Sequence, residues 1–195
     1  MFTGLIEEVG SISEINKNND GIELVVKAQK VLNGLRVNDS ISCSGICLTV
    51  IQKYDNAFKV QIVHETINKT TAKIWEIDSL INLERSLLPT TRMGGHFVQG
   101  HIDNVISVKS IDKMDNSAVW QFYLPQNLKR YIVQKGSVCL DGISLTVADK
   151  KDDYFSVALI PHTLKETTWR EKKIDDLINI EVDIMAKYIE SILGD

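Results

Sequence analysis

Short stretches of alternating or β-branched residues occur in both halves of the chain and predict a mainly β protein. The predicted strands are residues 22–26, 40–50, 58–63, 80–84, 119–124, 155–160 and 177–181. Short helical turns are expected at 66–73 and 126–131. Because closure removes exposed strand edges, so many short strands predict one small closed β-barrel in each half.

The second half of the chain repeats the first. Residues 37–84 align without a gap with residues 134–181, and the motif that begins at Gly4 returns at Gly100. Identical pairs recur through the whole alignment, for example Leu48 with Leu145. A register this long indicates a duplicated module. We therefore expect two domains, residues 1–92 and 93–184, joined near Pro89–Gly95.

The final segment, residues 185–195, has no counterpart in the first module. Apolar pairs recur four residues apart at 184/185, 188/189 and 192/193, which predicts a helix with one apolar face. A helix of about ten residues is not stable alone in water, so this face must pack on something. Packing on its own barrel and self-association with other copies of the chain are both compatible with the pattern.

Composition and charge narrow the functional classes. The 195 residues are 44% apolar and 25% charged, as in a globular protein, and the net charge of −4 disfavours a nucleic-acid partner. No apolar run predicts a transmembrane helix, and the N-terminus lacks the pattern of a signal peptide, so a cytoplasmic protein without a membrane partner is expected. Three cysteines fit a reducing compartment.

No metal site is predicted. If residues 40–50 form one strand, the sulfurs of Cys43 and Cys47 lie about 13 Å apart, too far to share a metal. His96 and His101 lack an acidic third ligand, and the pattern assigns no function to His96.

Duplicated barrels imply two similar pockets, and the two copies carry different groups at equivalent positions. The aligned pairs that differ include Cys47 with Ser144, Ser44 with Asp141 and Leu5 with His101. Equivalent pockets with different reactive groups suit a reaction in which one compound plays two roles.

Four long motifs resemble riboflavin synthase. They are Met1–Gly10 (MFTGLIEEVG), Gly45–Val50 (GICLTV), Gly94–Asp103 (GGHFVQGHID) and Asp141–Val147 (DGISLTV). The resemblance spans nearly the whole chain and implies two tandem six-stranded Greek-key barrels and a C-terminal trimerisation helix. It also implies a homotrimer in which each active site forms between the first barrel of one subunit and the second barrel of its neighbour.

The resemblance implies the dismutation of two molecules of 6,7-dimethyl-8-ribityllumazine per active site. One molecule gives a four-carbon unit to the other, which yields riboflavin and 5-amino-6-(D-ribitylamino)uracil without a cofactor or metal. Lumazine synthase is a candidate partner. The alternative is a non-catalytic antenna protein of the same fold that only binds a lumazine or flavin.

The motif matches predict the residues that line the two pockets. The first pocket is assigned Gly4, Leu5, Ile6, Cys47, Leu48, Thr49, Gln61, Ile62, Val63, His64, Glu65 and Thr66. The second pocket is assigned Gly100, His101, Ile102, Ser144, Leu145, Thr146, Ala158, Leu159, Ile160, Pro161, His162 and Thr163, with Lys135 contributed by the neighbouring subunit.

Five residues are candidates for the chemistry. His101 is the candidate for moving a proton, because imidazole can take up and release protons near neutral pH. Cys47 is either a nucleophile or proton carrier, or a small core residue. Asp141 and Ser144 are expected to bind ring nitrogens or a water, although Asp before Gly also forms turns. Ser40 is placed near the site by the resemblance, while its repeat partner argues for an architectural role.

Overall fold

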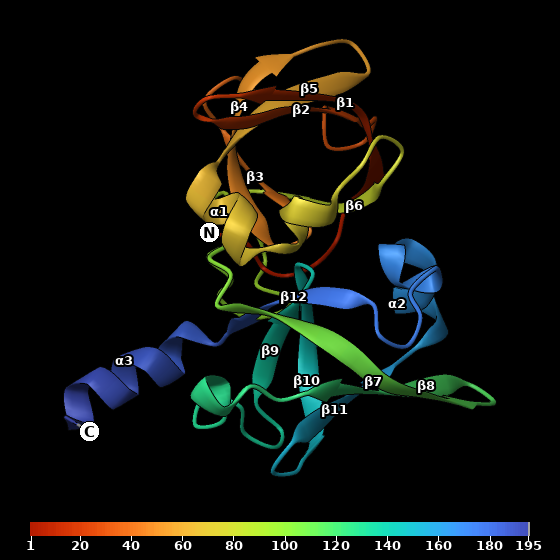
Figure 1. Cartoon of the computed structure of the whole chain (residues 1–195), viewed down its shortest axis with the longest axis vertical. Helices are drawn as coiled ribbons and strands as arrows, with labels where there is room; N and C mark the ends of the chain where they lie inside the picture. Colours follow the sequence, from red (N-terminus) through yellow and green to blue (C-terminus); the bar gives the residue numbers. More distant parts are fainter. Residues whose placement is uncertain (195) are drawn as a thin grey trace.

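The computed structural model describes residues 1–194 and contains two closed antiparallel β-barrels in tandem, followed by a helix (Figure 1). The first barrel consists of β1 (Glu8–Asn18), β2 (Gly21–Lys27), β3 (Ser40–Cys43), β4 (Ile46–Lys53), β5 (Ala57–Val63) and β6 (Leu80–Arg85). The second consists of β7 (Asn104–Met114), β8 (Ser117–Tyr123), β9 (Ser137–Leu140), β10 (Ile143–Lys150), β11 (Tyr154–Leu159) and β12 (Leu177–Val182).

Both barrels have the same strand order, which confirms the predicted duplication. The first runs β1-β2-β5-β4-β3-β6 and closes between β6 and β1. The second runs β7-β8-β11-β10-β9-β12 and closes between β12 and β7. In each barrel the second strand pairs with the fifth across the intervening hairpin, so the fold class predicted from the sequence is confirmed.

Short helices follow the fifth strand of each barrel. They are α1 (His64–Lys69) with η1 (Thr71–Ile74), and α2 (Pro161–Glu166) with η3 (Thr168–Arg170). A further short helix, η2 (Gln126–Leu128), lies after β8. The helical turns expected at 66–73 and 126–131 are therefore confirmed in place, with shifted ends.

Each barrel has its own apolar core. The first core is mainly aliphatic, whereas the second contains a cluster of Trp120, Phe122, Phe155 and Trp169. The rings of Trp120 and Trp169 stack with centroids 5.1 Å apart and planes 14° apart. All the tryptophans of this cluster belong to the second barrel, so their fluorescence reports on that barrel.

The prediction of one strand over residues 40–50 is wrong. The segment is a hairpin whose turn, Ser44-Gly45, has φ values of +45° and +84°, so that Ser42 faces Cys47 on the adjacent strand. The separation of about 13 Å derived for Cys43 and Cys47 was therefore also wrong. Within residues 1–194, no group of three His, Cys, Asp or Glu side chains could hold a metal ion.

The two hairpin turns pack against each other and fix the barrels together. Asn82 and Asn179, both fully buried, reach across the contact. The Asn82 amide donates to Asp141 O (3.0 Å), and the Asn179 amide donates to Ser44 O (2.9 Å). Each asparagine thus satisfies the turn of the opposite barrel, which gives the interface an approximate two-fold character.

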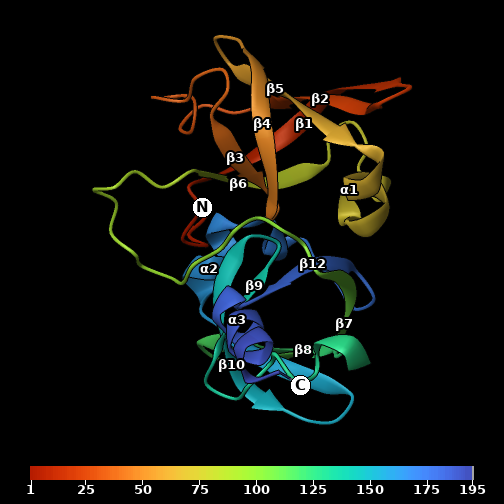
Figure 2. The ribbon, with the colours of Figure 1, turned by 90° about the vertical axis from the view of Figure 1, so that its left-hand side faces the viewer.

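The C-terminal helix α3 (Ile184–Leu193) projects from the second barrel (Figures 1 and 2). Its Lys187 pairs with Asp103 at 2.5 Å, and its Glu190 bonds to Arg130 and Tyr131. The apolar residues of α3 stay exposed: Met185 54%, Tyr188 59%, Ile189 53%, Ile192 81% and Leu193 73%. The predicted helix is confirmed, and its own barrel leaves most of its apolar face uncovered. Among the described residues, no helix has the length and apolar character to cross a membrane.

Candidate active site

Two extended segments cross from one barrel to the other and carry the repeated glycines. The N-terminal segment leads into the first barrel but lies on the second, where Ser144 N donates to Gly4 O (2.8 Å). The segment before β7 leads into the second barrel but lies on the first, where Cys47 N donates to Gly100 O (2.9 Å).

This crossing corrects the composition of the two predicted pockets. Gly4–Ile6 lies with Ser144, and Ile6 packs against the core of the second barrel. Gly100–Ile102 lies with Cys47, and Ile102 packs against the core of the first. The assignment of Gly4–Ile6 to the Cys47 pocket, and of Gly100–Ile102 to the Ser144 pocket, was wrong.

The strands leave room for these segments. β4 pairs with β5 only from Val50 onward, and β10 pairs with β11 only from Val147 onward. Cys47 and Ser144 precede those points, so their amides are available to the crossing segments. The pairing is long-range in sequence, and the repeat alignment carries no signal for it.

Glycine is required where the segments cross. Gly4 and Gly100 have φ values of +78° and +81°, a region that side chains disfavour. A Cβ on Gly4 would lie 2.6 Å from the Cβ of Ser144, and one on Gly100 would lie 2.5 Å from the Cβ of Cys47. The two motif glycines therefore permit close backbone contact with the two candidate reactive residues.

Two buried glutamates anchor the crossing segments. Glu84 accepts hydrogen bonds from Thr3 N (2.7 Å), the Thr3 hydroxyl (2.7 Å) and Gly4 N (2.9 Å). Glu181 accepts from the amides of Gln99 (2.6 Å), Gly100 (2.8 Å) and His101 (2.9 Å).

Burial raises the pKa of both Glu84 and Glu181, and that of Glu181 reaches about 7. Neither glutamate was predicted from the sequence to belong to the site. Their identity at equivalent positions of the two repeats was the available signal.

The remaining predicted binding residues divide by burial. Leu48, Ile62 and Leu159 point into the cores and can reach a ligand only through the backbone. The side chains that face solvent are those of Leu5, Thr49, Gln61, Val63, His64, Glu65, His101, Thr146, Ala158, Ile160, Pro161 and His162. The intermediate residues are Ile6, Cys47, Thr66, Ile102, Ser144, Leu145 and Thr163. Most of the predicted binding side chains are therefore exposed or partly exposed.

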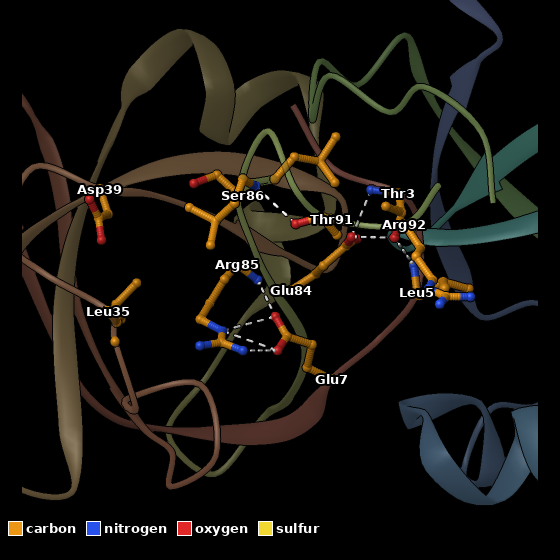
Figure 3. Close-up of a pocket in the computed structure, with 13 residues that line it drawn as sticks. Thr3, Leu5, Glu7, Leu35, Asp39, Glu84, Arg85, Ser86, Thr91 and Arg92 are labelled. Carbon is orange, nitrogen blue, oxygen red and sulfur yellow. Dashed lines mark hydrogen bonds and ion pairs between the residues drawn. The ribbon is translucent and has the colours of Figure 1, made fainter. Parts of the chain in front are cut away.

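A separate hollow of about 410 Å³ lies at the side of the first barrel (Figure 3). Arg85 and Glu7 form an ion pair in it, with Nη2 and Oε2 2.5 Å apart. Although burial opposes it, this pairing holds the pKa of Glu7 below its ordinary value. Of the predicted binding residues only Leu5 lines the hollow, so it is not the predicted site.

Comparison with known proteins identifies the family. The profile described as "Lumazine binding domain" matches residues 3–86 and 99–183, one barrel each. Riboflavin synthase of Actinobacillus pleuropneumoniae is 42% identical over 99% of this chain and 90% of its own length. Riboflavin synthase of Brucella abortus is 40% identical over 96% of both. The chain belongs to the riboflavin synthase family.

A solved structure titled as LumP complexed with riboflavin matches with a TM-score of 0.85 at 23% identity, over 93% of this chain and 99% of LumP. LumP complexed with 6,7-dimethyl-8-(1'-D-ribityl) lumazine matches with a TM-score of 0.84 at 21% identity, over 93% of this chain and 99% of LumP. At these identities the likeness supports the fold alone.

In this riboflavin synthase family member, Asp141 lies inside the barrel interface. It is 3% exposed, and its carboxylate accepts from Asn179 N (2.9 Å) and Trp169 Nε1 (3.1 Å), with Lys172 Nζ 3.8 Å away. Burial raises its pKa despite these partners. A carboxylate this deeply buried at the turn has little surface to offer a substrate ring, so the placement favours the turn-forming alternative that the sequence left open.

The other candidates are less buried than Asp141. Cys47 is partly buried and packs against Phe2, Val98 and Cys139. Ser40 lies on β3 opposite Thr49, one strand away from Cys47. Lys135 is exposed, in the turn before β9, with a φ of +67°. Its side chain faces solvent.

Proposed function

We propose that this protein is a riboflavin synthase. It converts two molecules of 6,7-dimethyl-8-ribityllumazine into riboflavin and 5-amino-6-(D-ribitylamino)uracil. The observation that carries the proposal is the pair of equivalent surfaces that carry different side chains. One combines Cys47 with the segment of His101, and the other combines Ser144 with the segment of Leu5. Matching shapes recognise the same compound twice, and the different groups assign it two roles.

The chemistry needs a proton acceptor, a nucleophile and two rings held face to face. We assign proton transfer to His101, and nucleophilic or proton-carrying roles to Cys47 and Ser144, with Ser40 in support. Asp141 holds the hairpin turn that precedes Ser144. The crossing segments offer backbone groups at fixed positions for a planar heterocycle. Orientation of two bound rings can supply about 7–11 kcal/mol of the barrier reduction, so much of the rate derives from positioning.

The proposed assembly is a homotrimer with each active site between subunits. Its support is the exposed apolar face of α3 and the exposure of most of the predicted binding side chains. A groove of about 720 Å³ lies between α3 and the second barrel, with Tyr131, Val133 and Ile189 in its lining. Burying this face removes apolar area from water, and joining two open surfaces would enclose the ring pair. In this arrangement Lys135 extends into the site of the neighbouring subunit.

Three further expectations stay predictions. Association with lumazine synthase would pass the substrate directly from the enzyme that makes it, and co-purification of the two proteins tests this. A cytoplasmic location is a second prediction, and fractionation of the source cells tests it. The domain limits 1–92, 93–184 and 185–195 are to be tested by limited proteolysis.

The deciding experiment mixes the purified protein with 6,7-dimethyl-8-ribityllumazine, without metal or cofactor, and follows both compounds by absorbance and chromatography. We expect two lumazines to be consumed for each riboflavin formed. His101→Gln and Cys47→Ser should lower kcat, while Asn127→Ala, on the exposed η2, should not.

Tight fluorescent binding of lumazine without riboflavin formation would contradict the enzyme and favour the antenna alternative. That alternative draws its support from the fold shared with LumP, whose structures contain lumazine or flavin. If the protein neither bound lumazine nor formed riboflavin, both the enzyme and the antenna hypothesis would be contradicted.

A further inference from the structure

His96, to which the sequence pattern assigned no function, is hydrogen-bonded to Ser144. His96 Nδ1 lies 2.7 Å from Ser144 Oγ, and His96 is only partly exposed. The two residues are 48 positions apart, so the contact brings the inter-barrel linker onto a candidate reactive residue of the second barrel. A histidine within hydrogen-bond distance of a serine hydroxyl is the arrangement that controls the direction and reactivity of that hydroxyl.

The contact is built into the fold. The linker is fixed by the antiparallel bridge between Phe2 and Val98, and His96 N donates to Thr3 O (3.2 Å). Next to it, a Cβ on Gly95 would lie 2.1 Å from Thr3 O and 2.8 Å from Ser144 Oγ. The linker is therefore packed between the N-terminal segment and Ser144 with no spare room.

The repeat explains why this histidine is needed. His101 follows Gly100, whose carbonyl accepts the amide of Cys47, and so a histidine adjoins the Cys47 surface. The equivalent position at the Ser144 surface is Leu5, which has no titratable group. The linker supplies His96 to the surface at which the crossing segment carries no histidine. Each surface thus has one imidazole beside it: His101 of the crossing segment beside Cys47, and His96 of the linker beside Ser144.

The surroundings favour a neutral imidazole. Burial lowers the pKa of His96, although the nearby carboxylate of Asp183 opposes this. A neutral ring has one nitrogen without a proton, and that nitrogen can accept a hydrogen bond from the Ser144 hydroxyl. The lone pairs of Ser144 Oγ are then left to face the ligand surface.

We propose that His96 is a positioning residue that holds the Ser144 hydroxyl in one orientation for the bound lumazine. The inference rests on the proposed riboflavin synthase activity and deepens it at the Ser144 surface. His96 acts through Ser144, so its effect on turnover must vanish when the hydroxyl is absent.

The test is a double-mutant cycle in the full-length protein, with kcat and KM measured for lumazine turnover. The variants are His96→Ala, Ser144→Ala and the double substitution. A misdirected reactive group can cost up to about a hundredfold in rate, and we expect His96→Ala to lower kcat by about tenfold to a hundredfold, with a smaller change in KM. In the Ser144→Ala background, His96→Ala should have no further effect on kcat.

Two outcomes overturn the inference. One is a wild-type kcat for His96→Ala. The other is a double variant in which the two fold-changes multiply, since this shows independent roles. Turnover by the wild-type protein establishes the proposed function separately, so either outcome leaves that function standing.

A conservative pair keeps the test decisive if His96→Ala does not fold. Asn places a polar atom near the position of Nδ1, whereas Gln places one near Nε2. We expect His96→Asn to retain more of the wild-type kcat than His96→Gln at equal melting temperature. Equal kcat values for the two variants would also overturn the inference, because a merely structural contact would not distinguish the two nitrogen positions.

Discussion

The backbone amide of Cys47 donates to the carbonyl oxygen of Gly100, 2.9 Å away, and this bond attaches the start of the second repeat to the reactive strand of the first. Its counterpart joins Ser144 to Gly4 at 2.8 Å. Each of the two surfaces is therefore assembled from both repeats within one chain. Two independent barrels joined by a flexible linker would not have this arrangement, so activity depends on how the barrels are docked.

Replacing Gly100 by alanine should disrupt this arrangement. The φ of +81° strains any side chain, and the new Cβ would meet the Cβ of Cys47 at 2.5 Å. Backbone strain of this kind costs about 1–3 kcal/mol, and a displaced site can lose about a hundredfold in rate. We expect lower stability in urea unfolding and a strongly reduced kcat/KM for lumazine turnover.

Gly34→Ala is the matched control for this prediction. Gly34 has a φ of +88°, but its new Cβ would meet only Arg85 Nη1 at 3.5 Å, an ordinary contact. This variant should lose stability through strain and keep its activity. Equal loss of activity in the two variants would show that backbone strain, and not the close contact with Cys47, explains the effect of Gly100→Ala.

A charge on the apolar face of α3 should dissociate the proposed trimer. Ile189 is 53% exposed in one subunit, and Ile189→Glu would bury an unpaired carboxylate in the assembly, at a cost of about 3–5 kcal/mol. We expect a monomer by light scattering and a loss of turnover, because each site needs a neighbour. Ser191→Glu adds the same charge to an exposed polar position of the same helix and should leave both mass and kcat unchanged. A monomeric wild-type protein with full activity would refute the shared site.

The features that the sequence revealed are those with a local or repeated pattern. Alternation at 22–26 and apolar pairs at 184–193 identified β2 and α3, because strand and helix periods repeat over neighbouring residues. The Ser44-Gly45 turn was missed, since serine is a weaker hairpin signal than the Asp-Gly of the second repeat. Local patterns were sufficient for the elements and for their duplication.

Local sequence patterns could not predict which segments meet at each of the two surfaces. Gly4 contacts Ser144 across 140 positions, and His96 contacts the same serine across 48. Such contacts depend on how two finished barrels dock, and no short pattern encodes that. The residues of the surfaces could be named from motifs, whereas their partners required the three-dimensional arrangement.

Asp141→Ala should lower stability more than catalysis. The substitution leaves the backbone N–H of Asn179 and the indole N–H of Trp169, both buried, without an acceptor. An unsatisfied buried donor costs about 1–3 kcal/mol. We expect a lower unfolding free energy, seen through Trp169 fluorescence, with most of the kcat retained in the folded protein. Asp115→Ala, at an exposed turn, is the control and should change neither quantity. Wild-type stability with a collapsed kcat would instead assign Asp141 to the chemistry.

The stability of the protein should depend on pH through Glu181. Its pKa rises from about 4.5 to about 7 on folding, because burial penalises the charged carboxylate more than its three backbone donors favour it. The folded state therefore holds a proton that the unfolded state releases above pH 4.5. The contribution of this group to stability is complete below that value, falls as pH rises to about 7, and is constant above it.

A shift of this size corresponds to a loss of about 3 kcal/mol across the window. Urea unfolding of the wild-type protein and of Glu181→Gln at several pH values between about 5 and 8 should show the wild-type stability falling relative to that of the variant as the pH rises, because glutamine does not titrate. Glu171→Gln, at an exposed position, should follow the wild-type curve throughout. The difference curve cancels the titration of other groups that shift on folding, such as Glu84 and His96. Parallel wild-type and Glu181→Gln curves would show that Glu181 stays ionised at the crossing segment, in which case its three backbone donors, and not burial, set its charge.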